Sequence, residues 1–547
     1  MKRILIVGGV AGGASAAARL RRLDEEAEII MFERGEYISF ANCGLPYYIG
    51  KEIVNKAALT VQTPDGFRKR YNIDVRTFNE VTAIDKENKT VAVTNVKTGE
   101  MYFEVYDKLI LSPGAAPILP SINGINSNKV FTLRNIPDTI KIIDYIETNR
   151  IRSVAVVGGG FIGVEMAENL HNLGLDVTLI EMQNQVLATL DYDTACAVHS
   201  YIKNKNVNLI LQNGVKSITD EGNYLTIALT NGKIEADMLI LAIGVKPETG
   251  LAKAAGLAVN ERGSIIVSEK MLTSDPNIYA AGDAVEITDF VTGQKGFVPL
   301  AGPANKQGRI AADNICGLDS KYTGTQGSSI VKLFDMTVAA TGINEKAARQ
   351  LGLDYEKSFI YSANHATYYP GAKTMCIKTV FEKVTGRILG VQIVGFDGVD
   401  KRCDVFATAI RAGMTAHDLT KLELCYAPPY SSAKDPVNMV GYVIEDILNG
   451  NAKIFHWHDV TELQCNENVT LLDVTTKLEY ESSAIKGFIN IPLDELRDRL
   501  HELDKAKPVY VNCMVGLRSY AAVRILAQNG FNAYYLSGGY RLYSSVL

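Results

Sequence analysis

The sequence lacks an excess of basic charge, a long apolar run and any regular spacing of cysteines. It has 56 lysine and arginine residues against 61 aspartate and glutamate residues, a net charge of −5, so no overall basic footprint for nucleic acid is expected. No apolar run approaches the roughly 18 residues of a membrane span. The eight cysteines are scattered without a disulfide framework or a metal-ligand cluster, which predicts no metal and favours a reducing, cytoplasmic location.

A second cysteine is also missing from the segment SFANCGLPYYIG, which contains Cys43 alone. A lone cysteine can form a mixed disulfide with a small thiol, become a sulfenic acid or remain a buried thiol. We expect Cys43 to be the redox centre and its partner to lie outside the chain. The other cysteines outside the C-terminal segment follow helix or strand patterns, and we expect them to be structural: Cys196, Cys316, Cys376, Cys403, Cys425 and Cys465.

The opening segment KRILIVGGVAGGASAAARLRR resembles a signal peptide in its basic start and apolar run, but we expect it to be retained. It contains an apolar strand, a glycine-rich turn and an alanine-rich helix, and Glu33 ends the next strand. This is a dinucleotide fingerprint, although Val10 replaces the middle glycine. The candidate cofactor residues are Gly8, Gly9, Ala11, Gly12, Gly13, Glu33 and Arg34.

The same unit occurs a second time in SVAVVGGGFIGVEMAENLHNLGLDVTLIEM, with an unbroken GxGxxG. Two such units predict two dinucleotides. An acid at the end of the second strand, followed by Met182, Gln183 and Asn184 without an arginine, favours NADH over NADPH. The candidate cofactor residues here are Gly158, Gly160, Phe161, Ile162, Gly163 and Glu181.

Three further strands end in glycine turns, over residues 106–117, 236–248 and 277–286. The whole set resembles the flavoprotein disulfide reductases with two dinucleotide-binding domains. This resemblance implies FAD in the first unit and NAD(P)H in the second, with Asp283 on the ribityl chain. It adds Gly114, Gly244, Gly282 and Ala301 to the cofactor-binding residues.

The pattern around Cys43 resembles the single-cysteine branch of that family, which includes coenzyme A (CoA)-disulfide reductases, NADH oxidases and peroxidases, and NADH-dependent persulfide reductases. The residues Ser39 to Cys43 are most similar to the CoA-disulfide reductases. The resemblance implies a CoA site, and basic groups there would suit the CoA phosphates. The candidate residues are Ser15, Arg19, Arg22, Ser39, Asn42, Arg70, Tyr71, Asn305 and Lys434.

From about Thr325 the pattern changes to alternating strands with two helices, and it resembles the dimerisation domain of the same family. The segments NHATYYPGA and LCYAPPYSSAKDP match two stretches that face the cysteine of the other subunit. The resemblance implies a homodimer in which Tyr368 and Tyr426 act on the leaving thiolate.

The C-terminal segment begins a new α/β unit, which resembles a rhodanese domain, and it contains CMVGLRS at a strand-to-helix turn. A cysteine at a helix N-terminus near an arginine has a stabilised anion, so Cys513 and Arg518 suit a persulfide carrier. A tyrosine-phosphatase loop, Cys-x5-Arg, is the alternative.

We therefore expect an α/β protein with two Rossmann-like dinucleotide-binding domains, an α+β dimerisation domain and a C-terminal α/β rhodanese domain. The expected boundaries are 1–150 with 272–324 for FAD, 151–271 for NAD(P)H, 325–453 for dimerisation and 454–547 for rhodanese. The expected activity is NAD(P)H-dependent reduction of CoA persulfide, polysulfide or CoA disulfide through a Cys43–CoA mixed disulfide. The alternatives are an NADH oxidase or peroxidase that cycles a sulfenic acid at Cys43, and a sulfur-binding redox sensor.

Overall fold

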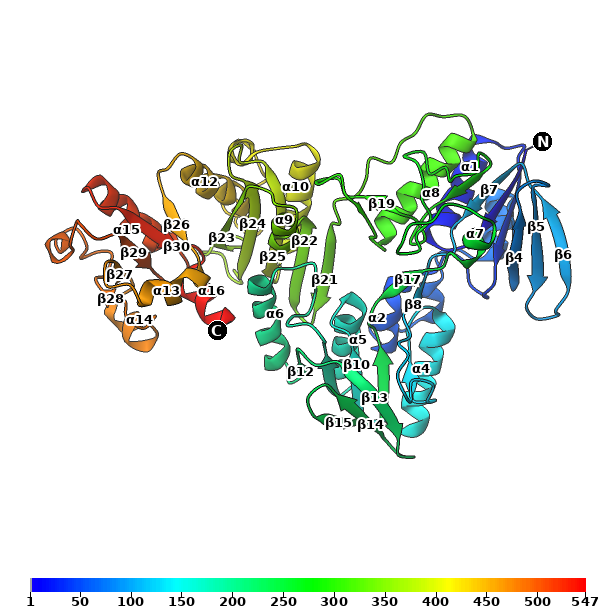
Figure 1. The fold of residues 1–547 in the computed structure, drawn as a ribbon, viewed down its shortest axis with the longest axis horizontal. Helices are drawn as coiled ribbons and strands as arrows, with labels where there is room; N and C mark the ends of the chain where they lie inside the picture. Colours follow the sequence, from blue (N-terminus) through cyan, green and yellow to red (C-terminus); the bar gives the residue numbers. More distant parts are fainter. Residues whose placement is uncertain (1) are drawn as a thin grey trace. The chain divides into compact units, whose positions relative to one another are not determined.

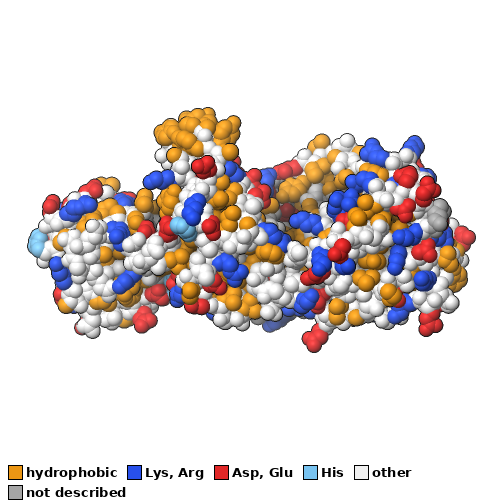
Figure 2. All heavy atoms as spheres, turned by 90° about the horizontal axis from the view of Figure 1, so that it is seen from above, with side chains coloured by type: hydrophobic (Ala, Val, Ile, Leu, Met, Phe, Trp, Pro, Cys, Tyr) orange, Lys and Arg blue, Asp and Glu red, His pale blue; other side chains and the backbone are white. Residues whose placement is uncertain are grey.

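The computed structural model describes residues 2–547, which divide into two compact units (Figure 1). The first unit runs up to Gln183 and from Val207 to Gly327, and the second comprises Asn184–Asn206 and Ser328–Leu547. Within residues 2–547, no helix is long and apolar enough to cross a membrane, and no cluster of His, Cys, Asp and Glu could hold a metal ion. Basic and acidic side chains are mixed over the face drawn in Figure 2.

A five-stranded parallel sheet forms the centre of the first half of unit 1. Its inner strands are continuous apolar runs, typical of a parallel sheet covered on both faces, and Ile4, Leu5 and Ile6 are fully buried. Helices α1 (Ala11–Leu23) and α8 (Ala301–Ile315) pack so closely that a Cβ on Gly308 would lie 2.2 Å from the carbonyl oxygen of Gly12. The strand order is β18 (Ile278–Ala280), β7 (Lys108–Leu111), β1 (Arg3–Val7), β2 (Glu28–Glu33) and β3 (Asp74–Thr77).

The other half of unit 1 repeats this arrangement with a second parallel sheet. Helix α5 (Phe161–Asn172) follows its central strand as α1 follows β1, and helix α4 (Ile136–Asn149) belongs to the same half. The strand order is β12 (Asn208–Ile210), β11 (Asp176–Ile180), β10 (Ser153–Val157), β16 (Met238–Leu241) and β9 (Val130–Phe131).

Small antiparallel sheets and short helices complete unit 1. One three-stranded sheet consists of β4 (Asn79–Asp85), β5 (Thr90–Asn95) and β6 (Met101–Val105). The other consists of β13 (Val215–Asp220), β14 (Leu225–Leu229) and β15 (Lys233–Ala236). The two-stranded sheets are β8 (Ala115–Pro117) with β17 (Val245–Pro247), and β19 (Ile287–Thr288) with β20 (Lys295–Gly296). The short helices are η1 (Asn42–Gly44), α2 (Leu45–Ile49), η2 (Lys56–Leu59), α3 (Pro64–Tyr71) and α7 (Gly250–Ala254).

Unit 2 contains a five-stranded antiparallel sheet, whose strands were expected from the alternating pattern after Thr325. The strand order is β21 (Ser329–Leu333), β22 (Met336–Gly342), β25 (Ile388–Gly395), β24 (Thr374–Glu382) and β23 (Tyr355–Ala363). The accompanying helices are α6 (Tyr192–Asn204), α9 (Glu345–Gln350), α10 (Val399–Arg411), α11 (Ala416–Thr420) and α12 (Pro436–Leu448). Helix α6 comes from the segment Asn184–Asn206 and is therefore distant in sequence from the sheet.

The C-terminal part of unit 2 is a five-stranded parallel sheet with flanking helices, drawn in orange and red in Figure 1. The strand order is β26 (Lys453–Phe455), β30 (Ala533–Leu536), β29 (Val509–Asn512), β27 (Thr470–Asp473) and β28 (Ile489–Asn490). The helices are η3 (Trp457–Asp459), α13 (Val460–Gln464), α14 (Lys477–Ser482), η4 (Leu500–Glu502), α15 (Leu517–Gln528) and α16 (Gly539–Val546).

A buried charge cluster joins the parts of unit 2. The ammonium group of Lys378, on β24, is fully buried and lies 2.8 to 3.0 Å from carboxylate oxygens of Asp191, Asp193 and Glu345. Lys357 also pairs with Glu345, at 2.7 Å. The indole N–H of Trp457, at the start of the C-terminal α/β part, donates to Asp193. Helix α6, the antiparallel sheet and the C-terminal part therefore share one polar core.

Candidate active site

The first glycine-rich turn connects β1 to α1. Gly8 has φ +95°, a conformation that favours glycine, and a Cβ on Gly13 would lie 1.9 Å from the Gly8 carbonyl oxygen. The Glu33 carboxylate accepts hydrogen bonds from the backbone N–H groups of Gly9 (3.0 Å) and Gly35 (2.8 Å). Ala11 begins α1, and Gly12 is buried within its first turn. The turn thus places a helix N-terminus and an acidic group side by side.

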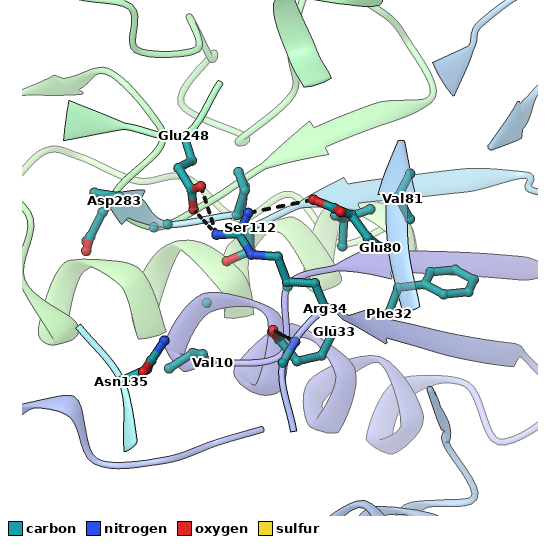
Figure 3. A pocket seen from close by; sticks show the side chains of 18 of the residues that line it. Val10, Phe32, Glu33, Arg34, Glu80, Val81, Ser112, Asn135, Glu248 and Asp283 are labelled. Carbon is teal, nitrogen blue, oxygen red and sulfur yellow. Dashed lines mark hydrogen bonds and ion pairs between the residues drawn. The ribbon is translucent and has the colours of Figure 1, made fainter. Parts of the chain in front are cut away.

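This turn opens onto a cavity of about 610 Å³ (Figure 3). Gly8, Ala11, Gly12, Glu33, Arg34, Gly114, Gly282 and Asp283 all line it, so eight candidate cofactor residues share one space. A volume of this size, a helix N-terminus for a pyrophosphate and an acid for a ribose together fit a bound dinucleotide.

Asp283 follows β18 and a glycine turn on the wall of the cavity. Burial raises the pKa of its carboxyl group to about 6. The neighbouring Gly282 N–H is used internally, since it donates to the side-chain oxygen of Gln307 at 2.8 Å. A buried carboxyl of this kind gains from a ligand that brings hydroxyl groups to it.

Arg34 lies at the rim of the cavity, and its guanidinium bonds both carboxylate oxygens of Glu248 at 2.8 Å (Figure 3). Glu80 is 3.7 Å away. Ala301 is exposed at the start of α8. Arg34, Glu80 and Glu248 line the cavity, whereas Ala301 does not, and Glu248 was not among the predicted site residues.

The second glycine-rich turn reproduces the contacts of the first. A Cβ on Gly163 would lie 1.8 Å from the Gly158 carbonyl oxygen, and the Glu181 carboxylate accepts from the N–H groups of Gly159 and Gln183, both at 2.7 Å. Gly160 caps α5, which begins with Phe161 and Ile162, and Gly244 has φ +112° just after β16. The same physical arrangement, a helix N-terminus beside an acid, suits a second dinucleotide.

The segment with Cys43 is held against the first turn by backbone hydrogen bonds. The Ser39 N–H donates to the Gly9 carbonyl at 2.8 Å, and Ser39 has φ +43°. The Ala41 N–H donates to the Leu59 carbonyl. Cys43 then lies on the short helix η1 with an exposed side chain, next to exposed Asn42, which also lines the cavity. The thiol is therefore accessible and fixed relative to the cavity.

Two nearby carboxyl groups influence the pKa of the Cys43 thiol. Partial burial, and then the charges of Glu165 and Asp283, raise the pKa of its thiol. Glu165, on α5, accepts a hydrogen bond from the Tyr47 hydroxyl at 3.3 Å, and burial raises its own pKa to about 7. Sequence reasoning missed this pair. The signals were present: an acid two residues after Gly163, and a tyrosine four residues after Cys43.

The candidate CoA residues on α1 have different surroundings. Ser15 donates from its hydroxyl to the side-chain oxygen of Asn305 at 2.6 Å, which brings two of the candidates together. Arg19 is neutralised by Asp313 at 2.6 Å. Arg22 is exposed and bonds only its own helix, through Nε to the Ala18 carbonyl oxygen. Among residues 2–547, an acidic partner is present for Arg19 and none for Arg22, so Arg22 is the better placed of the two to bind an anion.

Arg70 and Tyr71 lie at the end of α3. The Arg70 side chain is exposed, whereas the Tyr71 ring packs against Phe67 with centroids 5.4 Å apart. The Tyr71 carbonyl accepts from Arg21, so this end of α3 is anchored to α1. The helix therefore presents a basic side chain from a fixed support.

In unit 2, two loops bring the predicted tyrosines together. The hydroxyl groups of Tyr368 and Tyr426, 58 residues apart, are hydrogen bonded at 2.6 Å, and both side chains are exposed. This bond raises the pKa of Tyr368. Lys434 is exposed on the same second loop, and so is Cys425, which was expected to be structural.

A buried arginine sets the position of these two loops. Arg402, on α10, donates to the Asn364 carbonyl (2.9 Å), the Ser431 hydroxyl (3.1 Å) and the Asp435 carboxylate (2.9 Å). The Ala366 N–H also donates to the Ser431 carbonyl. Because one guanidinium binds both loops, the tyrosine pair has a rigid base.

Cys513 follows β29 in the C-terminal part and is fully buried. Its sulfur accepts hydrogen bonds from the N–H groups of Gly516 (3.2 Å) and Ser519 (3.3 Å). Gly516 has φ +102°, which turns the chain into α15. Two backbone N–H groups at the expected helix N-terminus therefore bond this sulfur, and such donors stabilise an anionic sulfur.

The Arg518 guanidinium is paired with an acid. Its two terminal nitrogens each donate to one oxygen of Glu479, both at 2.7 Å. Arg518 lowers the pKa of Glu479 to about 2, with help from Thr476. Sequence reasoning did not anticipate Glu479, which is 39 residues from Arg518.

Comparisons with known proteins cover the entire described chain. Residues 2–308 match the family model for pyridine nucleotide-disulphide oxidoreductase, residues 328–436 match its dimerisation domain, and residues 457–545 match the rhodanese-like domain. A coenzyme A disulfide reductase of Staphylococcus aureus (strain JH9) is 38% identical over 444 residues, which are 81% of this chain and 99% of the relative.

Two solved structures are similar over nearly the full length. The reduced CoADR-RHD of Bacillus anthracis is 54% identical, with a TM-score of 0.98 over 100% of this chain and 98% of the other. A NAD-dependent persulfide reductase from A. fulgidus is 39% identical, with a TM-score of 0.93 over 99% of this chain and 100% of the other. The chain therefore belongs to the pyridine nucleotide-disulphide oxidoreductase family, with the dimerisation domain of that family and an additional rhodanese-like domain.

Proposed function

We propose that the protein uses NADH to reduce CoA persulfide, a polysulfide or CoA disulfide through a mixed disulfide between Cys43 and CoA. The observation that carries this proposal is the accessible Cys43, which is fixed beside a dinucleotide-sized cavity and has no second cysteine in its segment. The similarity to a coenzyme A disulfide reductase and a persulfide reductase supports it.

Family membership implies FAD and NAD(P)H as cofactors. FAD would be held by the first glycine turn with Glu33 and Asp283, and NADH by the second turn with Glu181. NADH is preferred over NADPH because Glu181 is followed by Met182, Gln183 and Asn184, which offer no cation to a ribose phosphate. Bound FAD supplies two-electron transfer from the nicotinamide to the disulfide.

In the proposed reaction the Cys43 thiolate attacks the inner sulfur of CoA–S–SH. The S–S bond breaks, its electron pair leaves with the outer sulfur as HS⁻, and the Cys43–S–S–CoA disulfide remains. Two electrons from NADH then regenerate the Cys43 thiolate and release CoA–SH. The sum is CoA–S–SH + NADH + H⁺ → CoA–SH + H₂S + NAD⁺.

The tyrosine pair is proposed to serve the leaving thiolate. When one hydroxyl of the Tyr368–Tyr426 pair donates to the other, one O–H remains free to donate to sulfur. The dimerisation domain supports a homodimer in which the pair comes from the partner subunit. Arg22, Arg70 and Lys434 are exposed cations available for CoA phosphates, and Ser15, Ser39, Asn42, Tyr71 and Asn305 complete the proposed site.

Cys513 is proposed to carry sulfane sulfur as a persulfide, since two backbone N–H groups already bond its sulfur. The free thiolate of CoA can take up this sulfur: CoA–S⁻ + Cys513–S–SH → CoA–S–SH + Cys513–S⁻. The product is the persulfide that Cys43 is proposed to attack, which would explain why the two domains are fused. NADH, CoA and free thiols are cytoplasmic reagents in this scheme, so we place the protein in the cytoplasm.

The test combines turnover with mass spectrometry. Wild-type protein is expected to release sulfide from CoA persulfide in step with NADH loss and to carry a CoA adduct that a reductant removes. Cys43→Ser should lose both, whereas Cys465→Ser, a matched change at another exposed cysteine, should keep them. Full turnover in Cys43→Ser contradicts the proposal. Oxygen adducts without CoA would instead identify an NADH oxidase or peroxidase.

A further inference from the structure

One carboxylate joins two basic side chains at the wall of the first cavity. The Arg34 guanidinium donates to both oxygens of Glu248 at 2.8 Å (Figure 3). Glu248 also accepts a hydrogen bond from the guanidinium of Arg134. All three residues line the cavity of about 610 Å³. We call this set, Arg34 with Glu248 and Arg134, the ion bridge.

The members of the ion bridge come from separate parts of unit 1. Arg34 follows β2 of the first parallel sheet, and Arg134 lies between β9 of the second parallel sheet and helix α4. Glu248 follows β17, which pairs with β8 outside both parallel sheets. The ion bridge therefore ties a cavity wall from the first half of unit 1 to a cavity wall from the second half.

Backbone hydrogen bonds fix the position of the ion bridge. The Glu248 N–H donates to the carbonyl of Gly114 at 3.0 Å, and Gly114 also lines the cavity. The Arg134 N–H donates to the Asp138 carboxylate at 3.2 Å, in the first turn of α4. Burial alone would raise the pKa of Glu248, but the hydrogen bonds from Arg134 and Arg34 outweigh burial and lower the pKa. The carboxylate is therefore ionised at neutral pH.

The charges around the ion bridge balance. Glu80, which also lines the cavity, lies 3.7 Å from Arg34, so two guanidinium groups are matched by two carboxylates. Since each guanidinium is already paired, little positive charge is left to attract a phosphate. The arrangement suits a fastening between cavity walls better than a phosphate site.

We propose that Glu248 is a positioning residue for FAD, which fastens the two halves of unit 1 at the cavity and thereby slows release of the cofactor. This inference rests on the proposed binding of FAD at the first glycine turn. A ligand enclosed between two walls leaves faster when the walls separate more easily, so the ion bridge acts mainly on the rate of FAD dissociation.

The experiment measures FAD release from the full-length holoenzyme. Protein with bound FAD is mixed with an excess of radiolabelled FAD, and gel filtration follows the entry of label into the protein. Glu248→Gln removes the charge and keeps the shape of the side chain. Two ion pairs between partly exposed side chains are then lost together, so the release rate should rise about tenfold. Salt should speed release from wild type more than from Glu248→Gln, because it screens these pairs.

Three further variants separate the ion bridge from general effects of charge and stability. Arg134→Gln added to Glu248→Gln should release FAD no faster than Glu248→Gln alone, because the bridge is already broken. Glu36→Gln removes an equal charge from another residue that lines the cavity and should change the release rate less than about twofold. Lys378→Met removes a buried ion pair from unit 2 and should also leave the release rate within about twofold.

The inference is overturned if Glu248→Gln releases FAD at the wild-type rate, if the effects of Arg134→Gln and Glu248→Gln add, or if Glu36→Gln or Lys378→Met speeds release equally. Its failure is distinct from failure of the proposed function. Wild-type protein that binds no FAD would overturn both. FAD that leaves wild type and Glu248→Gln at one rate would overturn the inference alone, and NADH-dependent sulfide release through Cys43 would persist.

Discussion

Replacing Lys378 by methionine tests whether the buried charge cluster holds unit 2 together. The ammonium group has no exposed surface and touches Asp191, Asp193 and Glu345 within 3.0 Å. Methionine fills most of the lysine volume, so the change removes the charge. Glu345 keeps Lys357 as a partner, whereas Asp191 and Asp193 lose their lysine. Breaking a buried ion pair by removing one partner costs about 3–5 kcal/mol, and we expect a loss of that size in the free energy of unfolding.

The protein has a built-in reporter for this loss. Trp457 is the single tryptophan of the chain, and its indole N–H bonds Asp193 in the same cluster. Urea unfolding followed by its emission should show a much lower midpoint in Lys378→Met. Adding Asp193→Asn, which removes a buried carboxylate left without its lysine, should restore at least about 1 kcal/mol.

Lys421→Met is the matched control, since Lys421 is exposed, and it should shift stability by no more than about 0.5 kcal/mol. The reasoning is refuted if Lys378→Met and this control unfold alike, or if the added Asp193→Asn lowers stability further.

Two other predictions concern Glu165 and Arg402. Burial raises the pKa of the Glu165 carboxyl group from 4.5 to about 7. In flavin-free protein, the stability that the protonated carboxyl group contributes is therefore complete below pH 4.5 and is lost as the pH rises through about 7. The free energy of unfolding should fall by about 3 kcal/mol over this range. Glu165→Gln should flatten this part of the pH profile of thermal unfolding, and an unchanged profile would contradict the assignment. Arg402→Met should displace the loops of Tyr368 and Tyr426 and lower reductase kcat by at least about tenfold, while sulfur loading of Cys513 stays normal; a lower loading rate would point to general unfolding instead.

The fold class and family could be predicted from sequence because the decisive patterns are local. The glycine turns, the strand before each of them and the acid about twenty residues later all lie within one βαβ unit. The turn at Cys513 is equally local, since Gly516 and Ser519 provide the donors within six residues. The comparisons confirm the predicted domain types and their order.

The contacts that could not be predicted join residues far apart in sequence. Arg19 was proposed as a phosphate ligand on its helix position, but Asp313, 294 residues later, neutralises it. Lys378 and Asp193 are 185 residues apart, so nothing near Asp193 indicated that its helix would be buried in unit 2. Such pairings depend on tertiary packing, and one sequence alone carries no periodic signal for them.

The first parallel sheet also constrains how the chain folds during synthesis. Its strands β1, β2, β3 and β7 end by Leu111, but edge strand β18 begins at Ile278 and α8, which meets Gly12, ends at Ile315. At about 5–20 residues per second, the ribosome needs roughly 10–40 s to deliver the 204 residues from Leu111 to Ile315.

The second parallel sheet is complete by Leu241, so it can close while the first still waits for its last strand and helix. The first sheet is therefore synthesised first but completed last. During that interval its apolar strands β1, β2, β3 and β7 lack the edge strand β18 and helix α8 that cover them in the folded protein.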